Sequence, residues 1–463
     1  MLQIKNAHFV TAETTQHTDI WIQDEKMVQI GGTMPNEPDE IIDAKGQMVM
    51  PGGVDVHTHF DLDVGIATAT DSFYTGSIAA ACGGTTTIVD HMGFGPAGCD
   101  LRHQVDVYHG LAAGEAVIDY GFHGVLQHVD DQVLQDMETL IAEGITSYKA
   151  YLTYAYKLND DEVLRVLQRC KELGLMLTVH PENDGVVNYL REWYPKHGYT
   201  SPKYHPLSRP TECEAEAENR MMLFAHMADD APLYIVHLSN GLGLQYAQMA
   251  RRRGQKNLYL ETCPQYLFLD DSNYALPNNE GLKSIMSPPL RSKQDQKELW
   301  RGIEDGSIQT VATDHCPFFF HKEKQMGKDN FVQCPNGAPG VETRMMLLFS
   351  EGVMKKRISE NRFVEICCAN PAKLFGMYPQ KGSGLIGADA DLVFIDPSQN
   401  TLITKSILHE NVDYTLYEGM ELRGKITATM LRGKIIAKDG EFLGKKGEGR
   451  FMKRNRPMLI DYD

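Results

Sequence analysis

The chain has 463 residues, of which 42% are hydrophobic and 23% are charged, the usual balance of a globular protein with a sizeable core. The formal net charge is −17 at pH 7, so we expect neither nucleic acid nor an anionic membrane as a partner. No secretory signal and no apolar run of the roughly 20 residues that cross a bilayer is visible. The nine cysteines include no Cys-x-x-Cys pair, which predicts reduced thiols and a cytoplasmic protein.

Both ends of the chain have the texture of short β-strands, with alternating hydrophobic residues and glycine pairs at turns. Residues 1–50 and 377–440 therefore predict one small β-sandwich domain that is built from the two ends. Residues 441–463 are rich in Lys and Arg and predict an exposed C-terminal tail. A tail that lies across a neighbouring subunit is the alternative.

The middle of the chain, residues 51–376, alternates short apolar strands with helical patterns such as NDDEVLRVLQRCKELG, which begins at Asn159 and ends at Gly174. Eight strands that alternate with helices predict a (β/α)₈ TIM barrel. No Gly-x-Gly-x-x-Gly follows the first strand, which disfavours an open dinucleotide-binding sheet. The predicted strands cover residues 54–60, 85–92, 119–126, 147–153, 175–182, 233–239, 258–264 and 308–317.

Polar side chains with metal-binding chemistry follow the apolar strands of this predicted barrel. A lone histidine after a strand is more often a core residue than a ligand, but several at one barrel edge point to a site. Residues two apart face the same side of a strand, so His57 and His59 can reach one ion. The six candidate ligands are His57, His59, Lys149, His180, His237 and Asp314. We expect His91, His123 and His315 to be structural or to support the ligands.

Five motifs that occur in this order resemble the dihydropyrimidinase and hydantoinase family of cyclic amidohydrolases. They are PGGVDVHTHF, SYKAYLTY, TVHPEN, YIVHLSN and ATDHCPF. The stretches DVGIATATDSFYTGSIAAACGGTTTIVDHMGFGP and SYKAYLTYAYKLNDDEV resemble the bacterial D-phenylhydantoinase branch. The resemblance covers essentially the whole chain and implies an enzyme that hydrolyses a cyclic amide.

The resemblance implies that Lys149 is carboxylated by CO₂ and that its carbamate bridges two divalent metal ions. A free amine, with a pKa near about 10.4, would be cationic and would repel two dications. By motif, the more buried ion would have three ligands, His57, His59 and Asp314, and the other would have His180 and His237. These donors suit Zn²⁺, with Mn²⁺ and Co²⁺ as alternatives. A lysine that is simply paired with a carboxylate is the competing interpretation.

The implied mechanism is the attack of a hydroxide, shared by the two metals, on a ring amide. Asp314 would accept a proton and return it to the leaving nitrogen, and Tyr154 would donate a hydrogen bond to the oxyanion. Main-chain groups of Ser287 and Asn336 would bind the rest of the imide. The retained ligands and Tyr154 disfavour a non-catalytic scaffold relative, and the family resemblance implies a homotetramer.

The expected substrates are D-5-monosubstituted hydantoins, such as phenylhydantoin, which would open to N-carbamoyl amino acids. Dihydropyrimidinase activity on dihydrouracil or dihydrothymine is the main alternative, and allantoinase stays open. Dihydroorotase is disfavoured because Asp61 stands where those enzymes carry an arginine, and it would repel a substrate carboxylate. The family resemblance implies that the rim of the pocket includes Leu62, Val64, Tyr151 and Leu158, which form an apolar wall.

Overall fold

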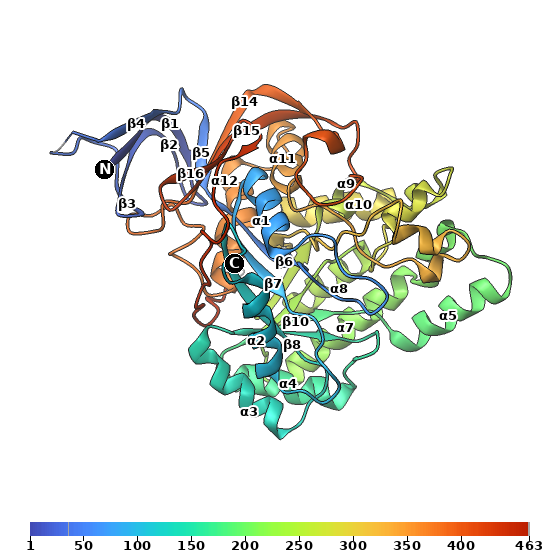
Figure 1. Ribbon diagram of the computed structural model, residues 1–463. Helices are drawn as coiled ribbons and strands as arrows, with labels where there is room; N and C mark the ends of the chain where they lie inside the picture. The colour runs from blue at the N-terminus through green and yellow to red at the C-terminus, as the bar shows by residue number, and fades with distance from the viewer. Residues whose placement is uncertain (36, 462–463) are drawn as a thin grey trace.

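The computed structural model describes residues 1–35 and 37–461, and its centre is a barrel of eight parallel strands (Figure 1). The strands occur in chain order around the sheet, which confirms the predicted (β/α)₈ barrel. Each of them overlaps a predicted strand. They are β6 (Gly53–Thr58), β7 (Thr85–His91), β8 (Asp119–Val125), β9 (Ser147–Tyr151), β10 (Met176–His180), β11 (Leu233–Ile235), β12 (Leu258–Thr262) and β13 (Thr310–Val311).

The first and last strands meet directly beside the candidate ligands. Thr58 forms an isolated parallel bridge with His315. The main-chain N–H of Asp314 donates to the carbonyl oxygen of His57 at 2.9 Å, and that of His59 donates to the carbonyl oxygen of His315 at 3.0 Å. Because this seam joins the two ends of the barrel sheet, it brings residues about 250 positions apart in sequence into register at one edge.

Helices cover the outside of the barrel, and α4 shows how the sequence specifies them. The Asn159 main-chain N–H donates to Glu162 at 2.8 Å, which satisfies an end group that a helix leaves unpaired. The buried face repeats at helical spacing, and Gly174 ends the helix with a left-handed φ of 68°. The longer helices are α1 (Phe73–Cys82), α2 (Leu101–Ala112), α3 (Asp131–Thr139), α4 (Asp160–Leu173), α5 (Asp184–Lys196), α7 (Thr211–Met227), α8 (Gly241–Arg252) and α10 (Lys293–Glu304). Shorter ones are α6 (His205–Ser208), α9 (Pro264–Phe268), α11 (Arg344–Leu348), α12 (Glu360–Val364) and α13 (Asn370–Leu374).

The two chain ends form a second, mostly antiparallel sheet, as expected, and this sheet lies beside the barrel in Figure 1. The junction between the ends is β5 against β14, where Val49 pairs with Phe394. Apolar side chains of both ends share one separate core cluster. The domain limits at residues 50, 376 and 440 stay a prediction. The strands are β1 (Leu2–Val10), β2 (Thr15–Gln23), β3 (Lys26–Ile30), β4 (Glu40–Asp43), β5 (Met48–Pro51), β14 (Leu392–Leu402), β15 (Glu421–Leu431), β16 (Lys434–Lys438) and β17 (Glu441–Phe442).

The expectation of a wholly exposed C-terminal tail is wrong for its central part. The main-chain N–H of Met452 donates to the carbonyl oxygen of Tyr120 on β8 at 2.7 Å. Arg454 is 3% exposed and donates to the carbonyl oxygen of Phe122 and to Oγ of Ser147, the latter at 3.0 Å. The segment therefore packs against its own barrel, where β8 and β9 supply acceptors that a buried guanidinium needs.

Candidate metal centre and active site

Three candidate ligands meet where the barrel closes. Nε2 of His57 and Nε2 of His59 each lie 3.1 Å from Oδ1 of Asp314. Asp314 has a left-handed φ of 54°, a strained conformation that is found disproportionately at functional sites. The three donor atoms are close enough together to hold one metal ion.

Two further candidates, His180 and His237, lie beside this group. Nδ1 of His180 is 2.8 Å from Nε2 of His237, and the ring centroids of His57 and His237 are 5.4 Å apart. His237 also has a left-handed φ, of 41°. The structure thus brings the four predicted histidines and the aspartate into one buried cluster.

The hydrogen bonds around these rings show that the cluster fits metal ions. Nδ1 of His57 lies 2.6 Å from Glu261, and Nε2 of His180 lies 2.8 Å from Glu182. Each carboxylate accepts a hydrogen bond from the ring N–H that faces it, so in the neutral imidazole the other ring nitrogen carries a lone pair. For His57 that nitrogen lies 3.1 Å from the Asp314 carboxylate, and a metal cation bound by both groups would satisfy the two buried acceptors.

Lys149 lies on β9 and is 1% exposed. Among the described residues, its ammonium nitrogen has neither a hydrogen bond nor an ion pair, and the Tyr151 ring lies 5.4 Å away. Burial lowers the pKa of Lys149 to about 8, although Asp314 and Glu261 act in the opposite direction. The competing interpretation, a lysine paired with a carboxylate, is therefore not what the structure shows.

The groups that support the ligands were not singled out in the sequence. Glu261 also accepts hydrogen bonds from the Tyr234 hydroxyl at 2.9 Å and from the His237 main-chain N–H at 3.0 Å. Glu182 is fully buried and forms an ion pair with Arg209. One available signal was an acidic residue inside the apolar strand LYLETC, because a buried carboxylate needs a partner.

The three remaining histidines have different surroundings. Nε2 of His123 lies 2.9 Å from the Val56 carbonyl oxygen, and Nε2 of His315 lies 2.9 Å from Asp71. Both therefore have the hydrogen bonds expected of structural or supporting groups. His91 is fully buried and stacks on His123 with ring centroids 4.2 Å apart, and neither of its ring nitrogens has a partner in the described part of the chain.

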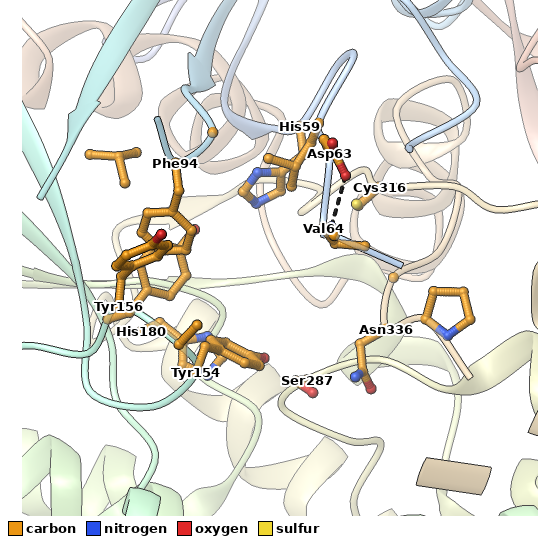
Figure 2. Close-up of a pocket in the computed structure, with 18 of the residues that line it drawn as sticks. His59, Asp63, Val64, Phe94, Tyr154, Tyr156, His180, Ser287, Cys316 and Asn336 are labelled. Atoms are coloured by element: carbon orange, nitrogen blue, oxygen red, sulfur yellow. Dashed lines mark hydrogen bonds between the residues drawn. The ribbon is translucent and has the colours of Figure 1, made fainter. Parts of the chain in front are cut away.

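The cluster opens into a cavity of about 900 Å³, which Figure 2 shows in close-up. Tyr154, at a left-handed φ of 79°, points into it from beyond β9, with its ring centroid 5.1 Å from that of His180. Ser287 and Asn336 line another part of the wall, as the family resemblance implied. All nine predicted site residues line this cavity: His57, His59, Lys149, Tyr154, His180, His237, Ser287, Asp314 and Asn336.

One side of the cavity is aromatic. The ring of Phe94 lies 5.3 Å from that of Tyr151 and 4.9 Å from that of Tyr156, edge-on or tilted, as aromatic pairs prefer. In Figure 2, Phe94 and Tyr156 lie across the cavity from Asn336. Phe94 and Tyr156 were not predicted from the sequence, because their loops have no period that reveals which way a side chain points.

One prediction about the rim is wrong. Of the four rim residues, Leu62, Val64 and Tyr151 line the cavity, but Leu158 does not. Leu158 is 4% exposed and belongs to the core, and its main-chain N–H donates to the Tyr151 carbonyl oxygen at 2.9 Å.

Asp61 is also absent from the cavity lining. Its Oδ2 accepts a hydrogen bond from the Phe73 main-chain N–H at 2.9 Å, at the start of α1. Repulsion of a substrate carboxylate by Asp61 is therefore not supported, although no arginine occupies this position to attract one.

A parallel eight-stranded barrel with histidine, aspartate and lysine gathered at the carboxyl edge of its strands defines a class of metal-dependent hydrolases. The chain belongs to the Amidohydrolase family, which it matches over residues 48–436. It is 54% identical over 452 residues to D-phenylhydantoinase of Escherichia coli, with 97% of each chain covered.

Solved structures resemble the chain over nearly its full length. A dihydropyrimidinase from Brevibacillus agri has a TM-score of 0.96 and 42% identity, over 98% of this chain and 99% of that one. An L-hydantoinase (dihydropyrimidinase) from Arthrobacter aurescens has a TM-score of 0.87 and 30% identity, over 97% and 99%. Within the described residues, none of the helices is both long and apolar enough to pass through a bilayer.

Proposed function

We propose that the protein opens the ring of D-5-monosubstituted hydantoins, phenylhydantoin among them, by hydrolysis to N-carbamoyl amino acids. The observation that carries this proposal is the aromatic side of the cavity, next to the histidine and aspartate cluster. An aryl substituent can pack against Phe94, Tyr151 and Tyr156 while the ring amide faces the cluster. The 54% identity to a D-phenylhydantoinase supports the same substrate class.

The cluster would hold two divalent ions per chain, Zn²⁺ in the first place and Mn²⁺ or Co²⁺ as alternatives. His57, His59 and Asp314 would bind one ion, and the facing pair of His180 and His237 would bind the other. When bound, such a pair polarises a carbonyl group and lowers the pKa of water to about 7.

Lys149 would join both ions as an N6-carboxylysine. A buried ammonium that forms no ion pair with any described residue is costly, whereas a carbamate formed from CO₂ and the neutral amine, with loss of one proton, is an anion that suits two cations. Purification in ¹³C-bicarbonate should give a carbamate NMR signal and two metal equivalents per chain. Lys149→Ala should lose the signal and bind less metal. A wild-type enzyme that is active and fully metallated without the signal would contradict the proposal.

The protein's own groups would move the proton and stabilise charge. Asp314 would take a proton from the attacking water and deliver it to the leaving ring nitrogen, so that the C–N bond breaks and this nitrogen becomes the NH₂ of the carbamoyl group, while the attacked carbonyl carbon becomes a carboxylate. The Tyr154 hydroxyl would donate to the carbonyl oxygen as negative charge develops there. Main-chain groups of Ser287 and Asn336, which line the cavity, would fix the rest of the imide.

Dihydropyrimidinase activity is the alternative, and the match to the Brevibacillus agri structure is consistent with it. A panel of D- and L-5-substituted hydantoins, dihydrouracil, dihydrothymine and allantoin separates the candidates. We expect the highest kcat/KM with D-phenylhydantoin. A much higher value with dihydrouracil would reverse the order, and no activity after metal and bicarbonate are supplied would favour a scaffold role.

We further propose that the protein is a homotetramer and that it is located in the cytoplasm. Apolar side chains such as Tyr189 on α5, 63% exposed, and Met227 on α7, 64% exposed, would gain from burial between subunits. All nine cysteines are free thiols, which suits a reducing compartment. Light scattering on the eluting protein tests the assembly, and a monomer mass would contradict it.

A further inference from the structure

A second group of metal-binding side chains lies outside the cavity. It consists of Cys82, the last residue of α1, Glu342, which precedes α11, and His409, in the connection between β14 and β15. Their candidate donor atoms all lie within 4.8 Å of one another. Three segments distant in sequence thus bring a thiol, a carboxylate and an imidazole to one point.

Packing and hydrogen bonds hold these segments together. Nδ1 of His409 lies 2.7 Å from Oε1 of Glu342, and the His409 main-chain N–H donates to Oε2 at 2.5 Å. At the end of α1, a Cβ added to Gly83 would lie only 2.4 Å from the Glu342 carbonyl oxygen, so the helix end touches that main chain. The hydrogen bonds fix the His409 and Glu342 side chains against each other, and the packing at Gly83 holds the end of α1 beside them.

The chemistry of the group matches that of zinc ligands. Cysteine sulfur, histidine nitrogen and glutamate oxygen are the donors that Zn²⁺ takes, and three of them leave a fourth position for water. Cys82 is half-buried and the His409 side chain is 27% exposed, so an ion can reach the site from solvent. Glu410 accepts the Glu342 main-chain N–H at 3.3 Å and adds a second carboxyl group beside the site.

We propose that Cys82, Glu342 and His409 bind one divalent ion with affinity for sulfur, such as Zn²⁺ or Cd²⁺, separately from the cluster in the cavity. The thiol of Cys82 loses its proton to solvent as the bond to the metal forms. The bound ion joins α1, the segment before α11 and the β14–β15 connection, which places a cross-link between the barrel and the chain-end sheet. This inference does not depend on the proposed hydantoinase activity.

The test is a Cd²⁺ titration of the enzyme with its cavity metals in place, followed by the ultraviolet absorption of the cadmium–thiolate bond. Wild type should develop a band that saturates at one added equivalent, and Cys82→Ser should not. Cys99→Ser is the matched control, because Cys99 is the other partly exposed cysteine, and it should keep the band. A band of equal size in Cys82→Ser, or none in wild type, would overturn the site.

A second variant tests the imidazole. His409→Asn should keep the thiolate band but need at least about tenfold more Cd²⁺ to reach half saturation, since ligand changes weaken binding by at least as much as changes in their supports. An unchanged titration would remove His409 from the site. Saturating Zn²⁺ should also raise the Tm of wild type and of Cys99→Ser but not of Cys82→Ser. Equal rises in all three would contradict the cross-link.

Discussion

The buried pair of Glu182 and Arg209 allows a quantitative prediction. Both side chains are fully buried, and Glu182 accepts from the Arg209 guanidinium and from Nε2 of His180, the latter at 2.8 Å. Burial raises the pKa of Glu182, but Arg209 and His180 outweigh it and bring the pKa from an ordinary 4.5 to about 2. At about 1.4 kcal/mol per pKa unit, this depression corresponds to about 3 kcal/mol.

Glu182→Gln should therefore lower the free energy of unfolding by about 3–5 kcal/mol, because the amide leaves the Arg209 charge buried without a counter-charge. The affinity for the metal ion at His180 should fall about 10- to 100-fold, since the ring loses the carboxylate that orients it. Because the folded-state pKa is depressed, this stability is complete above about pH 4.5 and is lost as the pH falls toward 2.

Guanidinium denaturation and competition with a chelator measure the two effects. Glu216→Gln is the control, because Glu216 forms an exposed ion pair with Arg220 at 3.1 Å and its loss should cost less than about 1 kcal/mol. The double variant Glu182→Gln/Arg209→Met should lose less than the two single changes together, because no charge is then left unpaired. If Glu182→Gln were no less stable than Glu216→Gln and kept both metals equally well, the reasoning would fail.

Three further outcomes are expected. Tyr154→Phe should lower kcat about 100-fold with metal content unchanged, and equal turnover would remove the hydroxyl from the mechanism. Phe94→Ala should raise the KM for phenylhydantoin about tenfold. The KM for dihydrouracil, which has no ring substituent, should stay unchanged, and equal effects on both substrates would contradict an aryl site. Lys381→Met should lower the free energy of unfolding by at least about 3 kcal/mol, because it leaves buried carboxylates without their cation. The Lys381 ammonium lies 2.5 Å from Asp119 and 2.6 Å from Asp391 in a buried cluster. A thermal melt measures the effect, and an unchanged Tm would refute it.

The barrel and the approximate position of its site were predictable because both depend on local patterns. An apolar run of five to eight residues identifies a buried strand, and a histidine such as His180 at its end identifies the carboxyl edge. The β-rich chain ends were predictable for the same reason. The side-chain direction in the loop that contains Leu158 was not, because no strand or helix period extends there.

The sequence by itself determined the order of strands and helices and the approximate place of each barrel strand, since these follow from chemistry within a few neighbouring positions. Only the tertiary structure decided which groups meet: Glu261 with His57, 204 residues away, and Arg209 with Glu182. The same is true of Cys82 and His409. Such contacts depend on how whole elements pack. The residues next to a carboxylate in the sequence do not indicate which cation or imidazole it will contact in the fold.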